Sequence, residues 1–286
     1  MKKGHGKRRK KVAAVLLILL AALSFWLYRG NTAIQTTRIR IGGARIPASF
    51  RGFTIVQVSD LHNAEFGAGQ EKLLGAVREA SPDLIAVTGD LIDSRRTNVE
   101  KAMDFIAGAA AVAPVCSVTG NHEARTDQYP ILKKRMEEAG VSVLDNKGVT
   151  IRRGGDSIRL LGLEDPAFVN PDGTNAENAA VLDARLKEML KESGEYTVLL
   201  SHRPEQFGVY AANGVDLALC GHAHGGQIRL PFAGGLFAPN QGFFPKYSEG
   251  IYQKGRTRMA VSRGLGNSLA PVRIHNRPEL IVMTLS

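Results

Sequence analysis

The sequence predicts an α/β fold, and three observations lead to this prediction. Five short runs of apolar, often β-branched residues each end abruptly in Asp, Asn or His, which is the pattern of buried strands with a polar residue at the carboxyl end. Stretches of helical character lie between several of these runs. The chain has 286 residues, 44% of them hydrophobic, which is enough for a substantial core in one domain or two. In α/β proteins, ligands collect at the carboxyl ends of the strands.

The chain begins with a basic segment that is followed by an apolar one. Residues 1–11, MKKGHGKRRKK, contain seven Lys and Arg residues and no acid. In residues 12–28 only Ser24 is polar, so this run is at the lower limit for crossing a bilayer and is long for the apolar part of a signal peptide. We therefore predict a cytoplasmic tail at 1–11 and a transmembrane signal anchor at 12–28, with the rest of the chain outside the cell membrane.

Two other interpretations of the apolar run are a buried core helix and a cleaved signal peptide. A helix that is apolar on every face and lies beside seven cations favours the membrane over a core. No convincing cleavage site follows the run, because the small residues Ala22 and Ser24 lie inside it. A retained single-pass anchor is therefore favoured, and cleavage would make the rest of the chain a secreted protein.

The basic character of the chain is concentrated in this first segment. Removing its seven cations and Arg29 from the formal net charge of +10 leaves +2 for residues 31–286. The charge therefore favours contact with anionic headgroups and gives no support to nucleic-acid binding. The two cysteines, Cys116 and Cys220, each lie in an apolar strand-like run, so buried free thiols are favoured over a disulfide.

The remaining elements follow in order along the chain. Residues 29–50 are predicted to be a linker with an edge strand, because TTRIRI alternates between polar and apolar residues, and residues 51–286 are predicted to form the folded domain. The five predicted strands are residues 53–60, 83–90, 115–122, 196–202 and 216–224. Helices are expected at 70–80, 98–110 and 183–192.

The polar residues at the strand ends form a set that suits metal ions. They are Asp60, His62, Asp90, Asp93, Asn121, His122, His202, His222 and His224. Five of the seven histidines are in this set, so a chance accumulation of polar turn residues is disfavoured. Imidazoles combined with carboxylate and amide oxygens, without thiolates, suit Mn, Fe, Zn or Co. Seven donors fit two such ions about 3.5–4 Å apart that share a bridging carboxylate, an arrangement used in phosphoryl displacement.

The motifs SDLH, TGDLID, TGNHE, LLSH and GHAHGG, in this order, resemble the five blocks of the calcineurin-like metallophosphoesterase family over about residues 53–226. Further on, GGQIRLP, KYSEGIY, SRGLGNS and RIHNRPEL resemble the bacterial membrane-associated phosphodiesterases similar to UDP-2,3-diacylglucosamine hydrolase relatives. The family resemblance implies a four-layer sandwich, with two mixed sheets packed face to face and helices outside.

The resemblance also implies a role for each strand-end residue. Asp60, His62 and His224 would hold one metal ion, Asn121, His202 and His222 the second, and Asp90 would bridge them. A hydroxide between the ions would be the nucleophile. His122 would protonate the leaving oxygen or stabilise the phosphoryl charge, and Asp93 would orient the His122 ring.

These expectations lead to a phosphodiesterase or pyrophosphatase that acts on a lipid-linked or cell-envelope phosphate. In residues 225–252, five apolar side chains among glycines and prolines would form an apolar lip for such a substrate, or simply anchor the loop to the core. They are Phe232, Leu236, Phe237, Phe243 and Phe244. Arg203, Arg229 and Arg263 are candidate phosphate contacts, with a surface position as the alternative for each. The functional alternatives are a phosphomonoesterase, including a protein phosphatase, and, remotely, a membrane-tethered metal-binding protein without catalysis.

Overall fold

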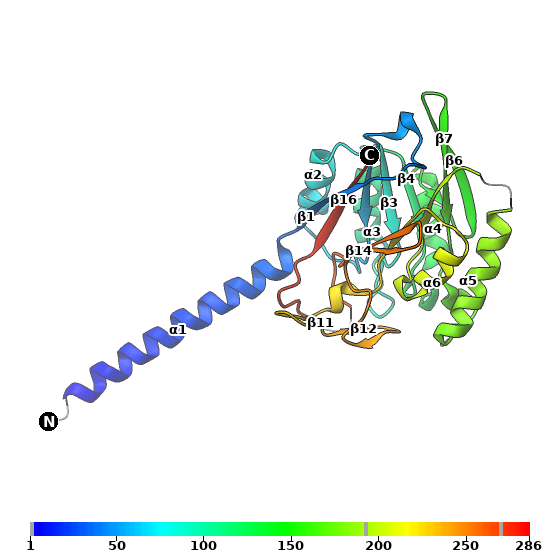
Figure 1. Cartoon of the computed structure of the whole chain (residues 1–286). Helices are drawn as coiled ribbons and strands as arrows, with labels where there is room; N and C mark the ends of the chain where they lie inside the picture. Colours follow the sequence, from blue (N-terminus) through cyan, green and yellow to red (C-terminus); the bar gives the residue numbers. More distant parts are fainter. Residues whose placement is uncertain (1–2, 192–193, 269–270) are drawn as a thin grey trace.

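The computed structural model describes residues 3–191, 194–268 and 271–286, with the side chains of the first helix described from residue 9 onwards. Helix α1 (Lys3–Thr32) projects from a body that is built of two β-sheets and the helices covering them, as Figure 1 shows. Residues 1–2 of the predicted basic tail lie outside the described residues. The division of the chain at residues 11, 28 and 50 stays a prediction.

The first sheet has six strands and carries the first three of the predicted strand ends. Its order is β1 (Gln35–Ile41), β16 (Glu279–Leu285), β2 (Thr54–Val58), β3 (Leu84–Thr88), β4 (Val115–Val118) and β5 (Ser142–Val143). Neighbouring strands are parallel except for β16 and β2, which are antiparallel. The register of β1 against β16 runs from Gln35 opposite Glu279 to Ile41 opposite Leu285. The alternating TTRIRI run therefore forms the edge strand that its pattern predicts.

The second sheet is also mixed and carries the fourth and fifth predicted strand ends. Its order is β14 (Gly250–Lys254), β15 (Thr257–Val261), β9 (Leu217–Cys220), β8 (Tyr196–Leu200), β7 (Asp156–Gly162) and β6 (Lys147–Arg153). The outer pairs, β14 with β15 and β6 with β7, are antiparallel, and the inner pairs are parallel. All five predicted strands are confirmed, each a little shorter than predicted.

Helices cover the outer face of each sheet. Those on the first sheet are α2 (Glu71–Glu79), α3 (Val99–Ala110) and α4 (Tyr129–Glu138), and those on the second are α5 (Asn175–Met189) and α6 (Phe207–Ala212). A further apolar cluster fills the space between the two sheets. The order of layers is therefore helices, sheet, sheet, helices, and the four-layer sandwich implied by the family resemblance is confirmed.

The alternation of side chains along the strands produces these layers. In β2, Ile55 packs between the sheets and Val56 packs against the helices. Successive strand residues point to opposite faces, so a strand covered on both sides must be apolar throughout. This is why the strands read as continuous apolar runs. The buried thiols of Cys116 and Cys220 lie in different layers and are free, as predicted.

Two of the three predicted helices agree with the sequence analysis, α5 differs in its start, and α4 and α6 were not predicted. Helices α2 and α3 lie within the predicted segments 70–80 and 98–110. Helix α5 begins at Asn175, well before the predicted segment 183–192, because Thr174 caps it. The Thr174 hydroxyl accepts a hydrogen bond from the Glu177 backbone N–H, and the Glu177 carboxylate accepts one from the Thr174 N–H.

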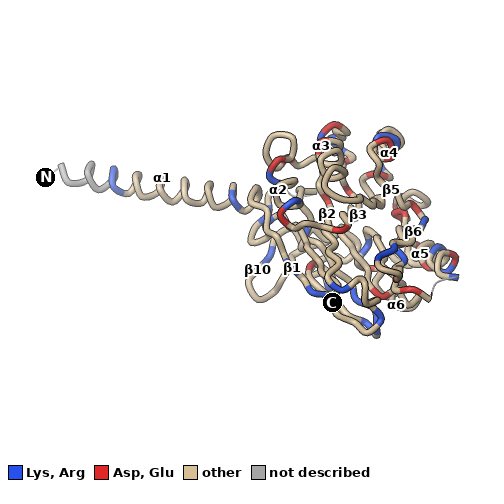
Figure 2. The backbone as a smooth tube through the Cα atoms, turned by 90° about the horizontal axis from the view of Figure 1, so that it is seen from above, with Lys and Arg blue, Asp and Glu red and all other residues tan. Residues whose placement is uncertain are grey.

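Helix α1 contains a span, Arg9–Thr32, of 24 residues that is long and apolar enough to cross a membrane. The most apolar window of this span has a mean hydropathy of 2.2 and is not buried in the protein, so the core-helix interpretation is wrong. Figure 2 shows the helix as an uncharged stretch between basic residues at its two ends. Its length and composition are those of a membrane anchor or a signal sequence.

Two short hairpins follow the last strand-end motif. They consist of β10 (Arg229–Leu230) with β11 (Gly234–Gly235), and β12 (Phe237–Ala238) with β13 (Gly242–Phe243).

Candidate metal centre

The seven expected ligands follow the carboxyl ends of five strands, and six of them, all but Asn121, belong to two groups of neighbouring ligand atoms. Asp60 and His62 follow β2, Asp90 follows β3, Asn121 follows β4, His202 follows β8, and His222 and His224 follow β9. All seven side chains are buried. Because the two sheets pack face to face with these ends at the same edge, residues far apart in the sequence form one buried polar cluster.

Most of the expected ligands have a strained backbone conformation. Five of the seven expected ligands have left-handed φ angles between 47° and 66°, and these are Asp60, His62, Asp90, His222 and His224. Such angles are uncommon for residues other than glycine and persist only where the surrounding structure imposes them. Gly221 shows how tightly that surrounding structure is packed, because a methyl group there would overlap the Ser59 hydroxyl and the Asp60 carboxylate.

The first group of side chains contains Asp60, His62, Asp90 and His224, whose ligand atoms lie within 4.8 Å of one another. The Nε2 atoms of His62 and His224 are 3.1 Å apart, and His224 Nε2 is 3.4 Å from Asp60 Oδ1. Two imidazole nitrogens and a carboxylate oxygen therefore converge on one small volume. This set of nitrogen and oxygen donors suits a divalent ion.

The second group contains Asp90, His202 and His222. Asp90 belongs to both groups, since its Oδ2 atom lies 3.5 Å from His62 Nε2 and 3.2 Å from His202 Nε2. His202 Nδ1 is 2.8 Å from the Thr88 carbonyl oxygen, which accepts the Nδ1 proton and leaves Nε2 as the free ligand atom.

Buried atoms without hydrogen-bond partners support the fit of metal ions. Within the described residues, Asn121 Oδ1 and His202 Nε2 are buried and have no hydrogen-bond partner. An unpaired buried polar atom is costly, and coordination to a metal ion would satisfy both. The donor chemistry and these two atoms therefore fit a pair of divalent ions.

Burial and charge shift the histidine pKa values in opposite directions. Burial lowers the pKa of His62 to about 3 and holds the pKa values of His222 and His224 well below normal. These rings are therefore neutral, which is the form that binds metal ions. Burial also acts to lower the pKa of His202, but the Asp90 carboxylate outweighs it and raises that pKa to about 10. A positive charge is thus favoured beside Asp90.

The two carboxylates of the cluster also differ. Burial is the main cause that raises the pKa of Asp60, to about 6. Burial acts in the same direction on Asp90, but His202 and His122 outweigh it and hold the pKa of Asp90 well below its usual value. Asp90 is therefore the more firmly ionised of the two carboxylates.

His122 lies at the rim of the cluster, with its ring centroid 4.5 Å from that of His62. Its Nδ1 atom accepts a hydrogen bond from the Ser94 backbone N–H at 3.0 Å. A backbone N–H can only donate, so the proton of the neutral His122 ring is on Nε2. The expected orienting residue, Asp93, instead accepts hydrogen bonds from Arg95 and lies 3.8 Å from His62 Nδ1. The ligand atoms of His62, Asp93 and His122 nevertheless lie within 4.8 Å of one another. Ser94 is thus an additional contact of the His122 ring, and the orienting role of Asp93 stays a prediction.

Glu123 is a site residue that the sequence analysis did not assign. Its carboxylate accepts backbone hydrogen bonds from Asp90 and Gly120 at 2.8 Å each and from Ile92 at 3.2 Å. Burial is the main cause that raises the pKa of Glu123 to about 7. Glu123 therefore connects the loops after β3 and β4 by hydrogen bonds. Its position directly after His122 in TGNHE is the feature by which the sequence could have indicated it as a site residue.

Arg203 is buried, so the surface interpretation is wrong for it. Its role as a phosphate contact stays a prediction. Its Nε and Nη2 atoms donate to Asp165 at 2.6 and 2.8 Å, and Nη1 donates to Asn240 Oδ1 at 2.9 Å. The same Asn240 oxygen is 3.1 Å from His222 Nε2. Arg203, Asp165 and Asn240 therefore support the position of His222.

The other two arginines also have acidic partners. Arg229 forms an ion pair with Glu249. Arg263 is buried, with its Nη2 atom 3.1 Å from Glu279 and its Nε atom 3.6 Å from Glu249. The surface interpretation is therefore wrong for Arg263, because these carboxylates allow its charge to be buried.

The aromatic side chains after the last ligand divide into two sets, because Tyr247 and Tyr252 pack against the core of the second sheet whereas four phenylalanines are exposed. The exposed ones are Phe232, Phe237, Phe243 and Phe244. Next to His224 lies a cavity of about 140 Å³ whose apolar lining includes Ile228, Leu236 and Phe237. The loop thus contributes an apolar surface beside the metal-ligand cluster.

Comparison with known proteins gives the same picture. The model of the calcineurin-like phosphoesterase family matches residues 53–226. The chain is 33% identical to the metallophosphoesterase YkuE of Bacillus subtilis over 88% of this chain and 85% of that protein. It is 28% identical to the phosphodiesterase YaeI of Escherichia coli over 82% of each chain. A transmembrane protein with a metallophosphoesterase domain from Danio rerio is 24% identical over 98% of this chain and 63% of that protein.

Proposed function

Since this chain belongs to the calcineurin-like phosphoesterase family and is a metal-dependent phosphoester hydrolase, we propose that it cleaves phosphodiesters or pyrophosphates at a site for two divalent ions. The single observation that carries the proposal is the shared position of Asp90. One oxygen of its carboxylate lies within 3.5 Å of a ring nitrogen in each of the two side-chain groups. A shared carboxylate is the feature expected of a two-metal centre.

The proposed ligands follow from these two groups. Asp60, His62 and His224 hold the first ion, Asn121, His202 and His222 hold the second, and Asp90 bridges them. Mn, Fe, Zn and Co all suit this set of donors. When bound, the two ions supply an activated water at neutral pH and neutralise the charge of the phosphate.

His122 is proposed to act on the leaving oxygen. The Ser94 N–H occupies Nδ1 and keeps the proton on Nε2. The Nε2–H group therefore donates a hydrogen bond to the leaving oxygen of the phosphate ester and stabilises the negative charge that develops there. The ring keeps its proton, and the departing oxygen takes its proton from water. Asp93, 3.8 Å from His62 Nδ1, is proposed to orient His62 as well as His122.

The substrate is proposed to carry an apolar group, as a lipid-linked phosphate or pyrophosphate does. The apolar cavity supports this, because His224 is part of its lining and a phosphate held at the metal centre would therefore lie next to it. Helix α1 supports it too, since an anchor at one end of the domain would hold the site near a bilayer. In the proposed topology, the basic N-terminus is cytoplasmic and the catalytic domain is outside.

The experiment that tests the two-metal phosphodiesterase uses the full-length chain in detergent. Metal is removed, then Mn, Zn, Fe or Co is added, and hydrolysis of bis-p-nitrophenyl phosphate is compared with that of the monoester p-nitrophenyl phosphate. We expect metal-dependent cleavage of the diester that Asp90→Asn abolishes together with metal binding. Cleavage of the monoester alone, or no cleavage by folded and metal-loaded protein, would contradict the proposal.

The lipid-linked substrate is tested by a ratio of rates. Leu236→Asp places a charge in the apolar cavity and should lower the rate on a long-chain diester relative to bis-p-nitrophenyl phosphate. Ile131→Asp is the matched control, because Ile131 is exposed on α4 and lies outside that cavity. Equal rates of the wild-type protein on the two diesters, with no change of ratio in Leu236→Asp, would argue against an apolar substrate group.

A further inference from the structure

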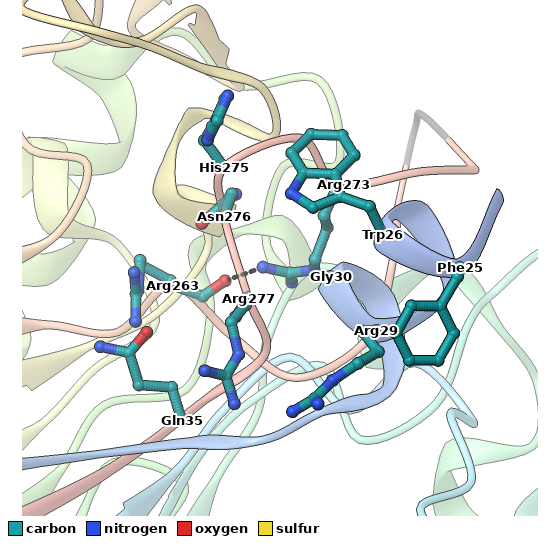
Figure 3. Close-up of a pocket in the computed structure, with 10 residues that line it drawn as sticks. All are labelled: Phe25, Trp26, Arg29, Gly30, Gln35, Arg263, Arg273, His275, Asn276 and Arg277. Atoms are coloured by element: carbon teal, nitrogen blue, oxygen red, sulfur yellow. Dashed lines mark hydrogen bonds between the residues drawn. The ribbon is translucent and has the colours of Figure 1, made fainter. Parts of the chain in front are cut away.

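A second cavity, of about 430 Å³, lies where helix α1 meets the folded body, and we call it the junction cavity. Figure 3 shows its lining. The lining residues are Phe25, Trp26, Arg29, Gly30, Gln35, Arg263, Arg273, His275, Asn276 and Arg277. Four of them are arginines, and none is acidic.

The cavity is built by specific contacts between α1 and the body. The Asn31 side chain accepts a hydrogen bond from the Arg273 backbone N–H at 2.7 Å and donates one to the Arg273 carbonyl at 3.2 Å. The Trp26 ring packs edge-on against His275, with the ring centroids 5.2 Å apart. The end of the helix is thus fixed to the segment 273–277, and the walls of the cavity hold a defined position.

The charge of the junction cavity is only partly compensated. Arg263 has Glu279 and Glu249 as ion-pair partners. Arg273 donates to the carbonyls of Arg263 and Gly266, with no carboxylate among its hydrogen-bond acceptors in the described residues.

The remaining two arginines add positive charge. Arg277 donates to the carbonyls of Ala33 and Ile34 at 3.0 Å each. The Arg29 side chain has neither a hydrogen bond nor an ion pair with the part of the chain that the structure describes. The cavity therefore attracts an anion.

One arginine inside the cavity also lacks hydrogen-bond acceptors. Arg263 is 8% exposed, and its Nε and Nη2 atoms have no hydrogen-bond partner within the described chain, although the two glutamates provide charge. Buried guanidinium N–H groups are normally satisfied. A bound phosphate oxygen would supply the acceptor, and arginine is well suited to phosphate.

The position of the cavity along α1 places it at the edge of a bilayer. The 24-residue span Arg9–Thr32 is about 36 Å long as a helix, somewhat more than the hydrocarbon thickness. Phe25, Trp26 and Arg29 are in its final turns, where aromatic and basic residues meet lipid headgroups. Phe232, which is fully exposed, is in the turn of the β10–β11 hairpin, and this hairpin lies beside the same end of α1 in Figures 1 and 2.

From these observations we propose that the junction cavity binds the phosphate group of an anionic phospholipid, with Phe25 and Trp26 against its glycerol and upper acyl chain. The lipid thereby holds the folded body against the membrane. The site is separate from the metal-ligand cluster, and its occupancy does not depend on the proposed hydrolysis. Arg273 forms the wall between the two, with its Nη2 atom 3.3 Å from His224 Nδ1.

The experiment measures lipid retention by native mass spectrometry of the full-length chain, purified from membranes in detergent. The probes are phosphatidylglycerol and phosphatidylcholine with identical acyl chains, and inorganic phosphate is added as a competitor. We expect one phosphatidylglycerol to be retained in preference to phosphatidylcholine. Arg29→Ala should weaken this retention about fivefold, the effect of one basic residue near a lipid surface. Trp26→Ala should weaken it as well.

Arg40→Ala is the matched control. It removes the same charge from an exposed position of β1 outside the cavity and should retain lipid like the wild type. Equal retention of the two lipids, or equal loss in Arg29→Ala and Arg40→Ala, would overturn the proposal. If inorganic phosphate displaces the lipid at the same concentration at which it binds to the lipid-free protein, the cavity is a site for a soluble anion and the proposal is overturned. If the chain purified from membranes has lost α1 by cleavage, the proposal is also overturned, because one wall of the cavity is then absent.

Discussion

Replacing Arg203 with alanine tests the support of the metal centre most directly. Arg203 and Asp165 are both buried and share two hydrogen bonds, at 2.6 and 2.8 Å. Arg203→Ala would leave the Asp165 carboxylate buried without its partner. Breaking a buried pair in this way costs about 3–5 kcal/mol of the free energy of unfolding. At roughly 2–4 °C per kcal/mol for a domain of this size, the Tm should fall by about 6–20 °C.

The assay is thermal unfolding of the metal-loaded, full-length chain in detergent, followed by circular dichroism. Arg229→Ala is the control, because the Arg229–Glu249 pair is more exposed and should contribute under about 1 kcal/mol. Arg203→Met combined with Asp165→Leu should recover much of the loss, since no charge is then left unpaired. An Arg203→Ala protein with an unchanged Tm and a raised KM would refute this reasoning and make Arg203 a phosphate contact.

Three further predictions concern the chemistry and the packing of the site. His122→Ala should lower kcat on bis-p-nitrophenyl phosphate by about 10²–10³-fold, because a hydrogen bond to the developing charge is lost, and the metal content by mass spectrometry should be unchanged. Ser94→Ala keeps the backbone N–H contact and should lose far less activity. Loss of metal in His122→Ala would contradict this role. Gly221→Ala should lower the free energy of unfolding by about 1–3 kcal/mol and weaken metal binding, because the added methyl group overlaps Asp60. Gly75→Ala is the control. Gly75 faces open space on α2, so its replacement should not destabilise the chain. Chelation should lower the free energy of unfolding of the wild type by about 2.7 kcal/mol for each ion present at 100 times its Kd, and the Tm should fall with it. A Tm insensitive to chelator would contradict a resident metal.

The sequence alone determined the strands of the core and the residues gathered at their ends. Strands covered on both faces must be apolar throughout, so the runs ending at Asp60, Asp90 and His202 were visible without any structure. The apolar helix before Arg29 was also visible in the sequence, because hydrophobicity is a local property of the chain.

Only the tertiary structure decided which side chains support these residues. The Ser94 backbone N–H contacts His122 Nδ1, because the backbone after β3 brings it there, and no side-chain pattern in the sequence shows such a contact. Arg203 turned out to be buried because Asp165, from a distant segment, neutralises it. The α5 start and the hairpins after His224 were likewise set by caps and turns that the apolar pattern did not reveal.

The junction cavity is a further feature that only the tertiary structure determines. Its aromatic and basic residues come from α1 and from segments near the C-terminus, and each looks ordinary in its own stretch of sequence. Apolar periodicity and strand-end chemistry are written in neighbouring residues, so the sequence displays them. Contacts such as Trp26 with His275 depend on how distant segments pack, and no local pattern carries that information.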